Sequence, residues 1–596
     1  MMITESTDRG FVNSYSNSKN NGGKKMKKKV LSFLLAGTRV LSLTACGGAA
    51  PAAPAQPAAE PAAEEAETTE AAPVEEAAAG ELTDGKFADT RHIVVEVYDR
   101  GNDGGSDPTN NMYTKYIHDG MLADHNVDVE FKAVPRWTEV DEINNLLAAG
   151  EAPDVCLTYS YATIQTYANM GGVQDLSELV ETYKADTPNL WNWLGEVNMY
   201  WDKSPVDGTL WAIEGKRATT NRINTFVRQD WLDALGMKAP TTTQEFEDML
   251  IAFKDNADKL LGKDAKKMVP YSVSFDVGWR SATLIESFMD PKMSDFDYYV
   301  NGFDDRKFTE EGTKDAVKLL NKWYNAGLMW NDFALYGEGD TTEDDMMKAG
   351  LVGAFTHNWD YPFRNGDDSI NANLQRIVGE NAKFVAIDPF DSKDGTHTKF
   401  VTSTAGDRKI FFPATNTEPL ASLLYLDWIS DPEHIQYLQL GDEGVTCKKL
   451  DDGSYETISA EGDAIMNSGF NIDYTITCNG LHLADDKLTE LSISHSYAGI
   501  DPEIVIEANK IANTDIRKEK CVNVGEISSE SGVGEALNSK RTEVYDKAVV
   551  AAEADFDAVW DEGMADYMGS GGQDIKDERT SKWKEVYGDT DTVPAP

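Results

Sequence analysis

The chain has 596 residues, of which 41% are hydrophobic and 10% aromatic, enough for a packed body of two or three domains. Lys and Arg number 55 against 102 Asp and Glu, so the formal net charge is −47 at pH 7. A surface this acidic repels nucleic acid and anionic lipid, which argues against both as partners of the folded surface.

The first segment that the pattern defines is an export signal. A lysine-rich stretch at 24–29 precedes an apolar run at 30–44, which is the layout of a secretory signal peptide. The small residues before Cys46 resemble the bacterial lipobox, and that resemblance implies cleavage before Cys46 and a lipid attached to its sulfur. We therefore expect residues 1–45 to be an N-terminal extension and lipoprotein signal peptide, with Met26 as the true start.

Residues 46–81 are almost entirely Ala, Pro and Glu, a composition that buries no apolar area and stays extended. This segment is expected to be a lipid-anchored linker that holds the folded body at the extracytoplasmic face of the cell membrane. No later segment has the roughly 20 apolar residues that a spanning helix requires.

The first part of the body alternates strands and helices. A strand at 93–98 ends in a glycine-rich loop at 99–105, a second strand lies at 127–131, a helix ends at Gly150, and a short strand at 152–157 precedes Tyr159 and Tyr161. This alternation predicts a mainly parallel sheet covered by helices. Ligands bind beyond the carboxyl ends of such strands, so the loops at 99–105 and 158–161 are candidate binding loops.

A second α/β block follows. It has a strand at 223–228, a helix at 230–235 that ends at Gly236, and a helix start at Thr242, which forms a capping box with Glu245. Further elements are expected as apolar helical stripes at 246–260 and 317–324, a strand at 351–355, a helix through Trp428 ended by Asp431-Pro432, and amphipathic helices between 539 and 587.

An ordered set of motifs runs through the body. The motifs are Gly150–Val155, Gly171–Leu176, Asp207–Ile213, Val227–Leu232, Phe411–Ala414 and Leu440–Val445. Together they resemble the bacterial extracellular solute-binding lipoproteins of ABC importers, in the long branch of the carbohydrate class. The resemblance implies an α/β, two-lobed periplasmic-binding-protein-like fold with hinge strands and a ligand cleft between the lobes. The implied lobes are 90–226 plus 357–412 and 227–356 plus 413–596.

The same resemblance implies a function. The chain would capture a carbohydrate, an oligosaccharide by its branch, and deliver it to permease subunits in the membrane. It would act as a monomer, without a cofactor or metal and without catalysis.

Sugars present C–H faces and hydroxyl edges, so a site needs flat aromatic rings together with Asp, Asn, Arg or Glu. Residues at strand ends and in polar loops fit this need, whereas Trp231, Trp323 and Trp428 lie in apolar stripes and are expected in the core. For Arg228 the alternative is an ion pair with Asp230 or Glu245. The candidate ligand-binding residues are Asp99, Arg100, Trp137, Tyr161, Arg228, Trp279, Trp359 and Asp360.

Other functions stay open at this point. A surface glycoside hydrolase or lyase is the main alternative, and a peptide or another polar solute, or a scaffold role, are further ones. The sequence has no H-E-x-x-H, G-x-S-x-G or P-loop motif. The acidic run Asp340–Asp345 lacks the calcium-loop pattern and is expected to be a solvated loop. Whether Cys447 and Cys478 form a disulfide is left open.

Overall fold

The computed structural model describes residues 82–593, with gaps at 101–104, 160, 196–197, 199–202, 205–206, 219–222, 305, 338–339, 365–367, 402–406, 459, 484, 498, 521, 526 and 531–532. From Leu82 onward these residues belong to one compact unit. The expected signal peptide, the start at Met26, the lipid-bearing Cys46 and the linker at 46–81 lie outside the described residues.

The first group of strands surrounds a parallel pair. β3 (Arg91–Asp99) and β4 (Val127–Pro135) pair in parallel over their whole length, and α1 (Met112–His125) connects them. Beside β3, a parallel bridge at Val95 and Val155 leads into β5 (Cys156–Thr158). The strand β13 (Lys409–Phe411) then lies antiparallel between β5 and β6 (Ile213–Glu214). Residues distant in the chain thus complete this sheet.

The second group is a four-stranded sheet with the order β11-β8-β10-β9. β8 (Ile223–Arg228) is antiparallel to both β11 (Phe384–Ile387) and β10 (Val352–Asn358), whereas β9 (Val269–Ser272) is parallel to β10. The expectation of a mainly parallel sheet was made for the first three strands of the body, and it is correct for β3 with β4 and for the bridge of β3 with Val155. No direction was predicted for β8 or β13, which pair antiparallel with their neighbours. Apolar patterning marks a strand but does not give its direction.

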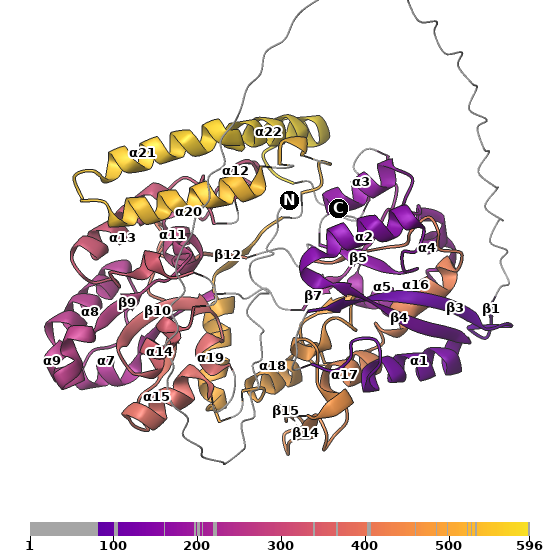
Figure 1. Ribbon diagram of the computed structural model, residues 1–596, viewed down its shortest axis with the longest axis horizontal. Coiled ribbons are helices and arrows are strands. Elements are labelled where there is room, and N and C mark those ends of the chain that lie inside the picture. The colour runs from indigo at the N-terminus through magenta and orange to yellow at the C-terminus, as the bar shows by residue number, and fades with distance from the viewer. Residues whose placement is uncertain are drawn as a thin grey trace, which may run out of the picture. The chain divides into compact units, whose positions relative to one another are not determined.

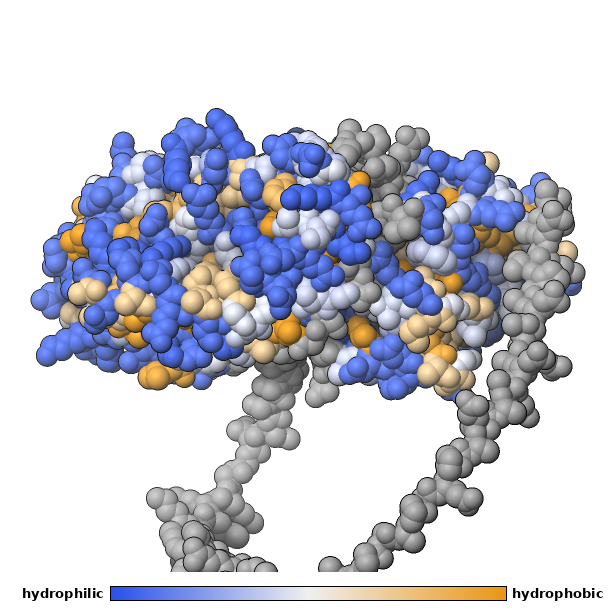
Figure 2. Space-filling model, turned by 90° about the horizontal axis from the view of Figure 1, so that it is seen from above, coloured by the Kyte–Doolittle hydropathy of each residue, from blue (hydrophilic) through white to orange (hydrophobic). Residues whose placement is uncertain are grey.

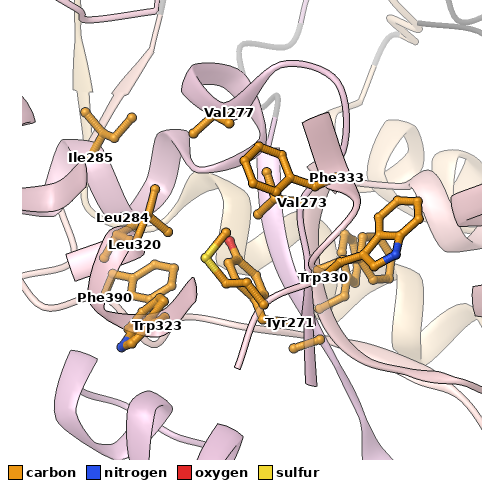
Figure 3. Packing of buried hydrophobic residues seen from close by; sticks show 14 of the residues in the cluster. Tyr271, Val273, Val277, Leu284, Ile285, Leu320, Trp323, Trp330, Phe333 and Phe390 are labelled. Atoms are coloured by element: carbon orange, nitrogen blue, oxygen red, sulfur yellow. The ribbon is translucent and has the colours of Figure 1, made fainter. Parts of the chain in front are cut away.

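Each group of strands has its own hydrophobic core. One core joins residues of β8–β11 to helices that cover them, and Figure 3 shows part of it, with Tyr271, Val277, Leu320 and Trp323 among the labelled side chains. The other core joins β3, β4 and β5 to Leu420–Ile429, Leu438, Tyr474 and Ile476. Trp231, Trp323 and Trp428 are 2%, 0% and 4% exposed, as expected for core residues.

These cores divide the chain differently from the expected lobes. Phe363, Phe384 and Phe390 pack with the core that contains Phe226 and Phe355, although they were assigned to the first lobe. Conversely, the segment from Leu420 to Ile476 packs with Ile93 and Val129, although it was assigned to the second. The lobe boundaries at 357–412 and 413–596 stay a prediction, and motif order alone does not reveal how often the chain crosses between the two cores.

Figure 1 shows further helices around the two groups of strands, and the last three helices of the chain lie together at the top of the view. The other helices of nine or more residues are α2 (Glu139–Ala149), α3 (Tyr161–Asn169), α8 (Thr243–Asp255), α13 (Thr313–Asn325), α15 (Ile370–Val378), α16 (Pro419–Trp428), α17 (Pro432–Leu440), α18 (Asp486–Ser494), α19 (Pro502–Asn513), α20 (Gly534–Val550), α21 (Phe556–Tyr567) and α22 (Gln573–Tyr587).

Shorter helices are α4 (Ser177–Tyr183), α5 (Pro188–Leu194), α7 (Gln229–Leu235), α9 (Ala257–Leu261), α10 (Val277–Arg280), α11 (Ala282–Phe288), α12 (Asp295–Asn301) and α14 (Thr342–Lys348). Short strands are β1 (Leu82–Thr83), β2 (Lys86–Phe87), β7 (Lys216–Arg217), β12 (Lys399–Val401), β14 (Cys447–Lys449), β15 (Tyr455–Thr457), β16 (Cys478–Asn479) and β17 (Ile516–Lys518).

Local signals in the sequence are largely confirmed. Gly150 and Gly236 end α2 and α7 in the left-handed conformation, with φ of 68° at each. The capping box at α8 forms only in half: the Thr242 hydroxyl accepts from the Glu245 N–H at 3.2 Å, but the Glu245 carboxylate accepts from Thr241 instead. Cys447 and Cys478 are buried free thiols, so the disulfide left open does not form here.

The face seen in Figure 2 is largely hydrophilic, with scattered hydrophobic residues, which fits the acidic composition. Among the described residues, no helix has both the length and the apolar character needed to cross a membrane.

Candidate functional site

One candidate site lies where the strands of the first group end. Because β3 and β4 are parallel, Asp99 pairs with Pro135 at one edge, and Arg100 and Arg136 follow there. Tyr159 follows β5 at Thr158, and the antiparallel pairing of Thr158 with Lys409 brings Arg408 to the same end of the sheet. This is the edge at which α/β sheets bind ligands. We call this group the arginine–tyrosine edge: Tyr98, Asp99, Arg100, Arg136, Tyr159, Arg217, Asp407, Arg408 and Asp473.

Two tyrosine rings and one guanidinium form the middle of the arginine–tyrosine edge. The rings of Tyr98 and Tyr159 stack with centroids 6.4 Å apart and planes 13° apart. The guanidinium carbon of Arg136 lies 4.9 Å from the Tyr98 ring centroid and 4.6 Å from that of Tyr159. A cation at this distance is attracted to the ring faces. Arg136 also donates to Glu139 at 3.0 Å, which fixes its orientation.

Arg100 is held by a buried carboxylate. Its Nε and Nη2 donate to the two oxygens of Asp473 at 2.7 and 2.8 Å, a bidentate pair. Burial alone would raise the pKa of Asp473, but the charge and hydrogen bonds of Arg100 hold the pKa of that carboxyl below its usual value. Asp473 therefore stays ionised and keeps Arg100 at the strand end.

The far side of the edge is also polar. Arg217 donates from Nη2 to the buried carboxylate of Asp407 at 3.0 Å, and Asn479 donates to the same oxygen at 3.0 Å. Arg408 donates from Nε to the Tyr159 hydroxyl at 3.0 Å and from Nη1 to the carbonyl of Ile472. Tyr159 and Arg217 are partly exposed, so the cluster reaches the surface.

A second candidate site lies at the corresponding edge of the other sheet. β9 and β10 are parallel, so the residues after Ser272 and after Asn358 lie at the same edge. The ring centroids of Trp279 and His357 lie 4.7 Å apart, with an interplanar angle of 75°. The His357 ring stacks on the Tyr361 ring, with centroids 3.4 Å apart and an interplanar angle of 16°. Phe275 lies 5.7 Å from Trp279. These four rings, Phe275, Trp279, His357 and Tyr361, form what we call the aromatic edge.

Buried polar contacts hold the aromatic edge. Arg280 donates to both oxygens of Glu343 at 2.6 and 2.8 Å, and the Tyr361 hydroxyl donates to Asp344 at 2.9 Å. The backbone N–H of Asn358 donates to Nδ1 of His357 at 2.8 Å, so the neutral imidazole carries its hydrogen on Nε2. Burial, together with nearby arginines, lowers the pKa of His357 well below its usual value. The imidazole is thus a neutral flat ring.

Trp279 is positioned by the turn before it. Phe275 has a backbone φ of 35°, a value that residues other than glycine rarely adopt. Asp276 caps α10, because its carboxylate accepts from the Trp279 N–H at 3.1 Å. Val277 of α10 lies in the core (Figure 3), which leaves Trp279 part-exposed. The Nε1 atom of Trp279 is buried and has no partner among the described residues. Backbone strain at Phe275 and an unused donor at Trp279 thus lie in one short turn, and such features are typical of binding sites.

The structure does not bring all of the candidate residues together. Asp99 and Arg100 lie at the arginine–tyrosine edge, and Trp279 belongs to the aromatic edge. Trp137 lies in the turn Arg136–Thr138 and Tyr161 begins α3, both close in sequence to the arginine–tyrosine edge, but their side chains lie outside the described residues.

Trp359 and Asp360 follow β10 but have structural contacts. The Trp359 ring lies 6.2 Å from that of Tyr497, whose hydroxyl donates to Asp360 at 2.7 Å. Arg364 donates to the other Asp360 oxygen at 2.6 and 2.9 Å. Asp360 is 6% exposed, and both oxygens of its carboxylate accept hydrogen bonds from side chains of the protein.

Arg228 lies away from the other candidates. Because β8 is antiparallel to β10, its carboxyl end is opposite to the aromatic edge. Arg228 donates to both oxygens of Asp230 at 2.7 and 2.8 Å and to the carbonyl of Gly350 at 2.9 Å. The ion pair with Asp230, one of the two alternatives open from the sequence, is the one that forms.

Sequence reasoning missed Tyr98, Arg136, Tyr159 and Arg408 at the first edge and His357 and Tyr361 at the second. Arg136 and Tyr159 lie within two residues of Trp137 and Tyr161, which were chosen, so the strand-end signal pointed to the same segments. Arg408 had no such signal, because its strand enters the sheet from a distant part of the chain.

Comparison with known proteins identifies the family of this chain. The model of the bacterial extracellular solute-binding proteins matches residues 117–446. The chain belongs to the bacterial extracellular solute-binding protein family.

Two curated relatives of this solute-binding protein come from Bacillus subtilis (strain 168). It is 24% identical over 345 residues to the polygalacturonan/rhamnogalacturonan-binding protein YtcQ, covering 55% of this chain and 63% of the relative. It is 26% identical over 233 residues to the lipoprotein LipO, covering 38% of this chain and 43% of the relative. The chain thus spans less than two thirds of the length of either relative in these matches.

Solved structures share the fold. The alginate-binding protein AlgQ2 matches with a TM-score of 0.55 and 16% identity, covering 83% of this chain and 98% of that chain. The Streptococcus pneumoniae substrate-binding protein FusA, solved with kestose, matches with a TM-score of 0.56 and 14% identity, covering 84% and 100%. The fold is therefore the two-lobed periplasmic-binding-protein-like fold that the sequence predicted.

In the described part of the chain, no group of three or more His, Cys, Asp or Glu side chains is placed to hold a metal ion. In the acidic run at 340–345, Asp340 accepts from the Thr342 N–H and Asp344 from the Tyr361 hydroxyl.

Proposed function

We propose that this solute-binding protein captures an oligosaccharide and delivers it to the permease subunits of an ABC importer. The observation that carries the proposal is the pair of strand-end sites. One is built from rings at Phe275, Trp279, His357 and Tyr361, and the other from tyrosines and arginines. Flat rings take the C–H faces of sugar rings, and charged donors and acceptors take the hydroxyl edges.

The relatives support a carbohydrate as the solute. YtcQ is named for binding polygalacturonan and rhamnogalacturonan, AlgQ2 for binding alginate, and FusA was solved with kestose. In the proposed ligand set, Asp99 and Arg100 are supported by their place at the end of β3 and Trp279 by its ring contacts, while Trp137, Tyr161 and Trp359 stay predictions from the sequence. Arg228 is left out because it lies at the opposite end of its strand and is paired with Asp230, and Asp360 because both of its oxygens are bonded inside the protein. Arg100 is also paired, with Asp473, and is retained only for its place at the end of β3.

We further propose that the chain acts as a monomer tethered by a lipid on Cys46 at the extracytoplasmic face of the membrane. The basic and apolar segments before Cys46 and the relative LipO, which is named as a lipoprotein, support this anchoring.

The alternative of a surface glycoside hydrolase or lyase is disfavoured by the carboxylates of the second sheet. A glycosidase needs two carboxyls that face the scissile bond, one as acid and one as base or nucleophile. Asp276 accepts from Arg306 at 2.5 Å and Asp360 from Arg364, so both are paired with arginines. We therefore propose binding without catalysis.

A thermal-shift and calorimetry screen of the full chain tests the proposal. The panel contains neutral oligosaccharides, acidic oligosaccharides and peptides, and the same samples are assayed for released reducing ends. A ligand at one hundred times its Kd stabilises the folded state by about 2.7 kcal/mol, so saccharides that bind raise the melting temperature. A shift with peptides alone contradicts the carbohydrate assignment, and released reducing ends contradict the assignment as a binding protein.

A further inference from the structure

Among the described residues, three arginines are less than 2% exposed, and they differ in the partners of their guanidinium groups. Arg228, Arg280 and Arg408 are 1%, 0% and 0% exposed. An arginine keeps its charge inside a protein, so burial requires a compensating negative charge. The partner of each guanidinium therefore shows how its charge is balanced.

Two of the three have a carboxylate of their own. Arg228 holds Asp230 by two hydrogen bonds of 2.7 and 2.8 Å, and Arg280 holds Glu343 by two of 2.6 and 2.8 Å. Each also donates to one backbone carbonyl. These are complete bidentate ion pairs of the kind that fixes a buried guanidinium.

Arg408 has none. Its Nε donates to the Tyr159 hydroxyl and its Nη1 to the Ile472 carbonyl, both of which are neutral acceptors. Its Nη2 is buried and has no hydrogen-bond partner in the part of the chain that the structure describes. Asp407 and Asp473 favour its charge, but neither forms a hydrogen bond with it. Both oxygens of Asp473 are bonded to Arg100, and Asp407 accepts from Arg217 through Oδ1, while its Oδ2 has no hydrogen-bond partner among the described residues.

A buried guanidinium without a direct counter-charge is costly, because several kcal/mol are lost when an ion leaves water without a partner. Arg408 is also placed where a ligand is expected. It bonds Tyr159, a part-exposed ring beyond the carboxyl end of β5, and it shares the arginine–tyrosine edge with Arg100 and Arg136. The missing negative charge and the location point to the same partner.

We propose that Arg408 binds an anionic group of the solute, so that the captured oligosaccharide is an acidic one that carries carboxylates on its sugar rings. This inference rests on the proposed function. A carboxylate accepts a charge-assisted hydrogen bond from Nη2 and supplies the charge that the fold does not. Since the chain as a whole carries a net charge of −47, an anionic solute gains nothing from the overall field and depends on this local group.

Calorimetry with two matched probes tests the inference. The first probe is an oligogalacturonide, and the second is the same oligomer with its carboxyls methyl-esterified, which keeps the rings and removes the charge. We expect the full chain to bind the acid at least tenfold more tightly than the ester. A sulfated oligosaccharide of similar length forms a third arm, because a sulfate ester offers the same negative oxygens.

Variants assign the preference to Arg408. Arg408→Gln should bind acid and ester with similar affinity, and Arg408→Lys should keep a preference for the acid. Arg228→Gln is the matched control, since it removes a buried arginine that lies away from the arginine–tyrosine edge. It should keep the acid preference and lose more stability in urea than Arg408→Gln does, because it leaves the Asp230 carboxylate unpaired.

The outcomes distinguish a failure of the inference about Arg408 from a failure of the proposed carbohydrate-binding function. Equal affinity of the wild type for acid and ester, or an acid preference that survives in Arg408→Gln, overturns the inference and leaves the carbohydrate function intact. Tighter binding of the sulfated probe than of the acid overturns the carboxylate assignment. A failure of every saccharide in the screen, neutral or acidic, overturns the proposed function itself. If Arg408→Gln does not fold, the comparison of acid with ester on the wild type and on Arg408→Lys still decides.

Discussion

The imidazole of His357 lies face to face with the phenol ring of Tyr361, with ring centroids 3.4 Å apart and planes 16° apart. Both residues are fixed from behind, because Nδ1 of His357 accepts from the Asn358 N–H and the Tyr361 hydroxyl donates to Asp344. Trp279 stands against the edge of this pair at 75°. The aromatic edge is therefore a preorganised surface, and a ligand that uses it does not have to order these rings first.

Trp279→Phe should weaken ligand binding by about tenfold, because each aromatic contact contributes on the order of 1 kcal/mol beyond its buried area and the Nε1 donor is lost as well. Trp330→Phe is the matched control, since Trp330 is 7% exposed and stacks on Tyr336 at 4.7 Å within the core. Calorimetry with the best saccharide of the screen measures both. An unchanged affinity of Trp279→Phe would remove the aromatic edge from the site.

The burial of His357 predicts a dependence of stability on pH. Its pKa in the folded state is depressed by burial, so below the ordinary pKa near 6.5 the unfolded chain binds a proton that the folded chain refuses. This contribution to stability is present above pH 6.5 and is lost by about 1.4 kcal/mol for each pH unit below it.

Urea unfolding of wild type and His357→Gln between pH 5 and pH 7.5 measures this loss. The variant should show a smaller fall in the free energy of unfolding at low pH than the wild type does. His92→Gln, in which an exposed histidine is replaced, is the control and should keep the wild-type slope. Parallel profiles of all three proteins would contradict the assigned burial effect.

Glu310 predicts a dependence of the opposite sign. This carboxyl is 5% exposed, neither oxygen has a partner among the described residues, and burial raises its pKa to about 8. Because the folded-state pKa of Glu310 lies above its unfolded-state pKa, its contribution to the free energy of unfolding is fully present below about pH 4.5. That contribution is lost as the pH rises to 8, by on the order of 5 kcal/mol in total.

Glu310→Gln removes this titration without changing the shape of the side chain. The variant should gain stability over the wild type as the pH rises from 5 to 8.5 in urea unfolding. Glu311→Gln, at the exposed neighbouring position, should follow the wild type. The idea fails if the difference between Glu310→Gln and wild type stays constant over this range.

How far the sequence predicts this fold depends on the range of the interactions. The strands predicted at 93–98 and 127–131 lie within β3 and β4, and the helix ends predicted at Gly150 and Gly236 are observed, because these features follow from local alternation and from glycine at a left-handed position. The direction of β8 and the entry of β13 beside β5 were not predicted, because both depend on pairing between segments more than a hundred residues apart.

The same division holds for the candidate site. Arg100 and Trp279 could be chosen as candidates because a strand end or a polar loop marks them in the sequence. Arg228 has the same mark, but the antiparallel direction of β8 takes it to the other edge and Asp230 neutralises it. Arg408 was not chosen, because the feature on which its proposed role rests is that no carboxylate forms a hydrogen bond with its guanidinium. That feature is visible only in the structure.

Gly120 predicts how closely the first core is packed. A Cβ atom at this position of α1 would overlap the indole of Trp428 on α16. The indole has little room to move, because its Nε1 donates to Asp124 at 2.9 Å and its ring stacks on His434 at 3.6 Å. Alanine favours a helix over glycine by about 1 kcal/mol, but overpacking costs about 1–3 kcal/mol, so Gly120→Ala should destabilise the protein in urea unfolding. Gly569→Ala, where no atom lies within 4 Å of the added Cβ, is the control and should be neutral or stabilising. Equal stability of the two variants would mean that α1 and α16 are less tightly packed than the contact between Gly120 and Trp428 requires.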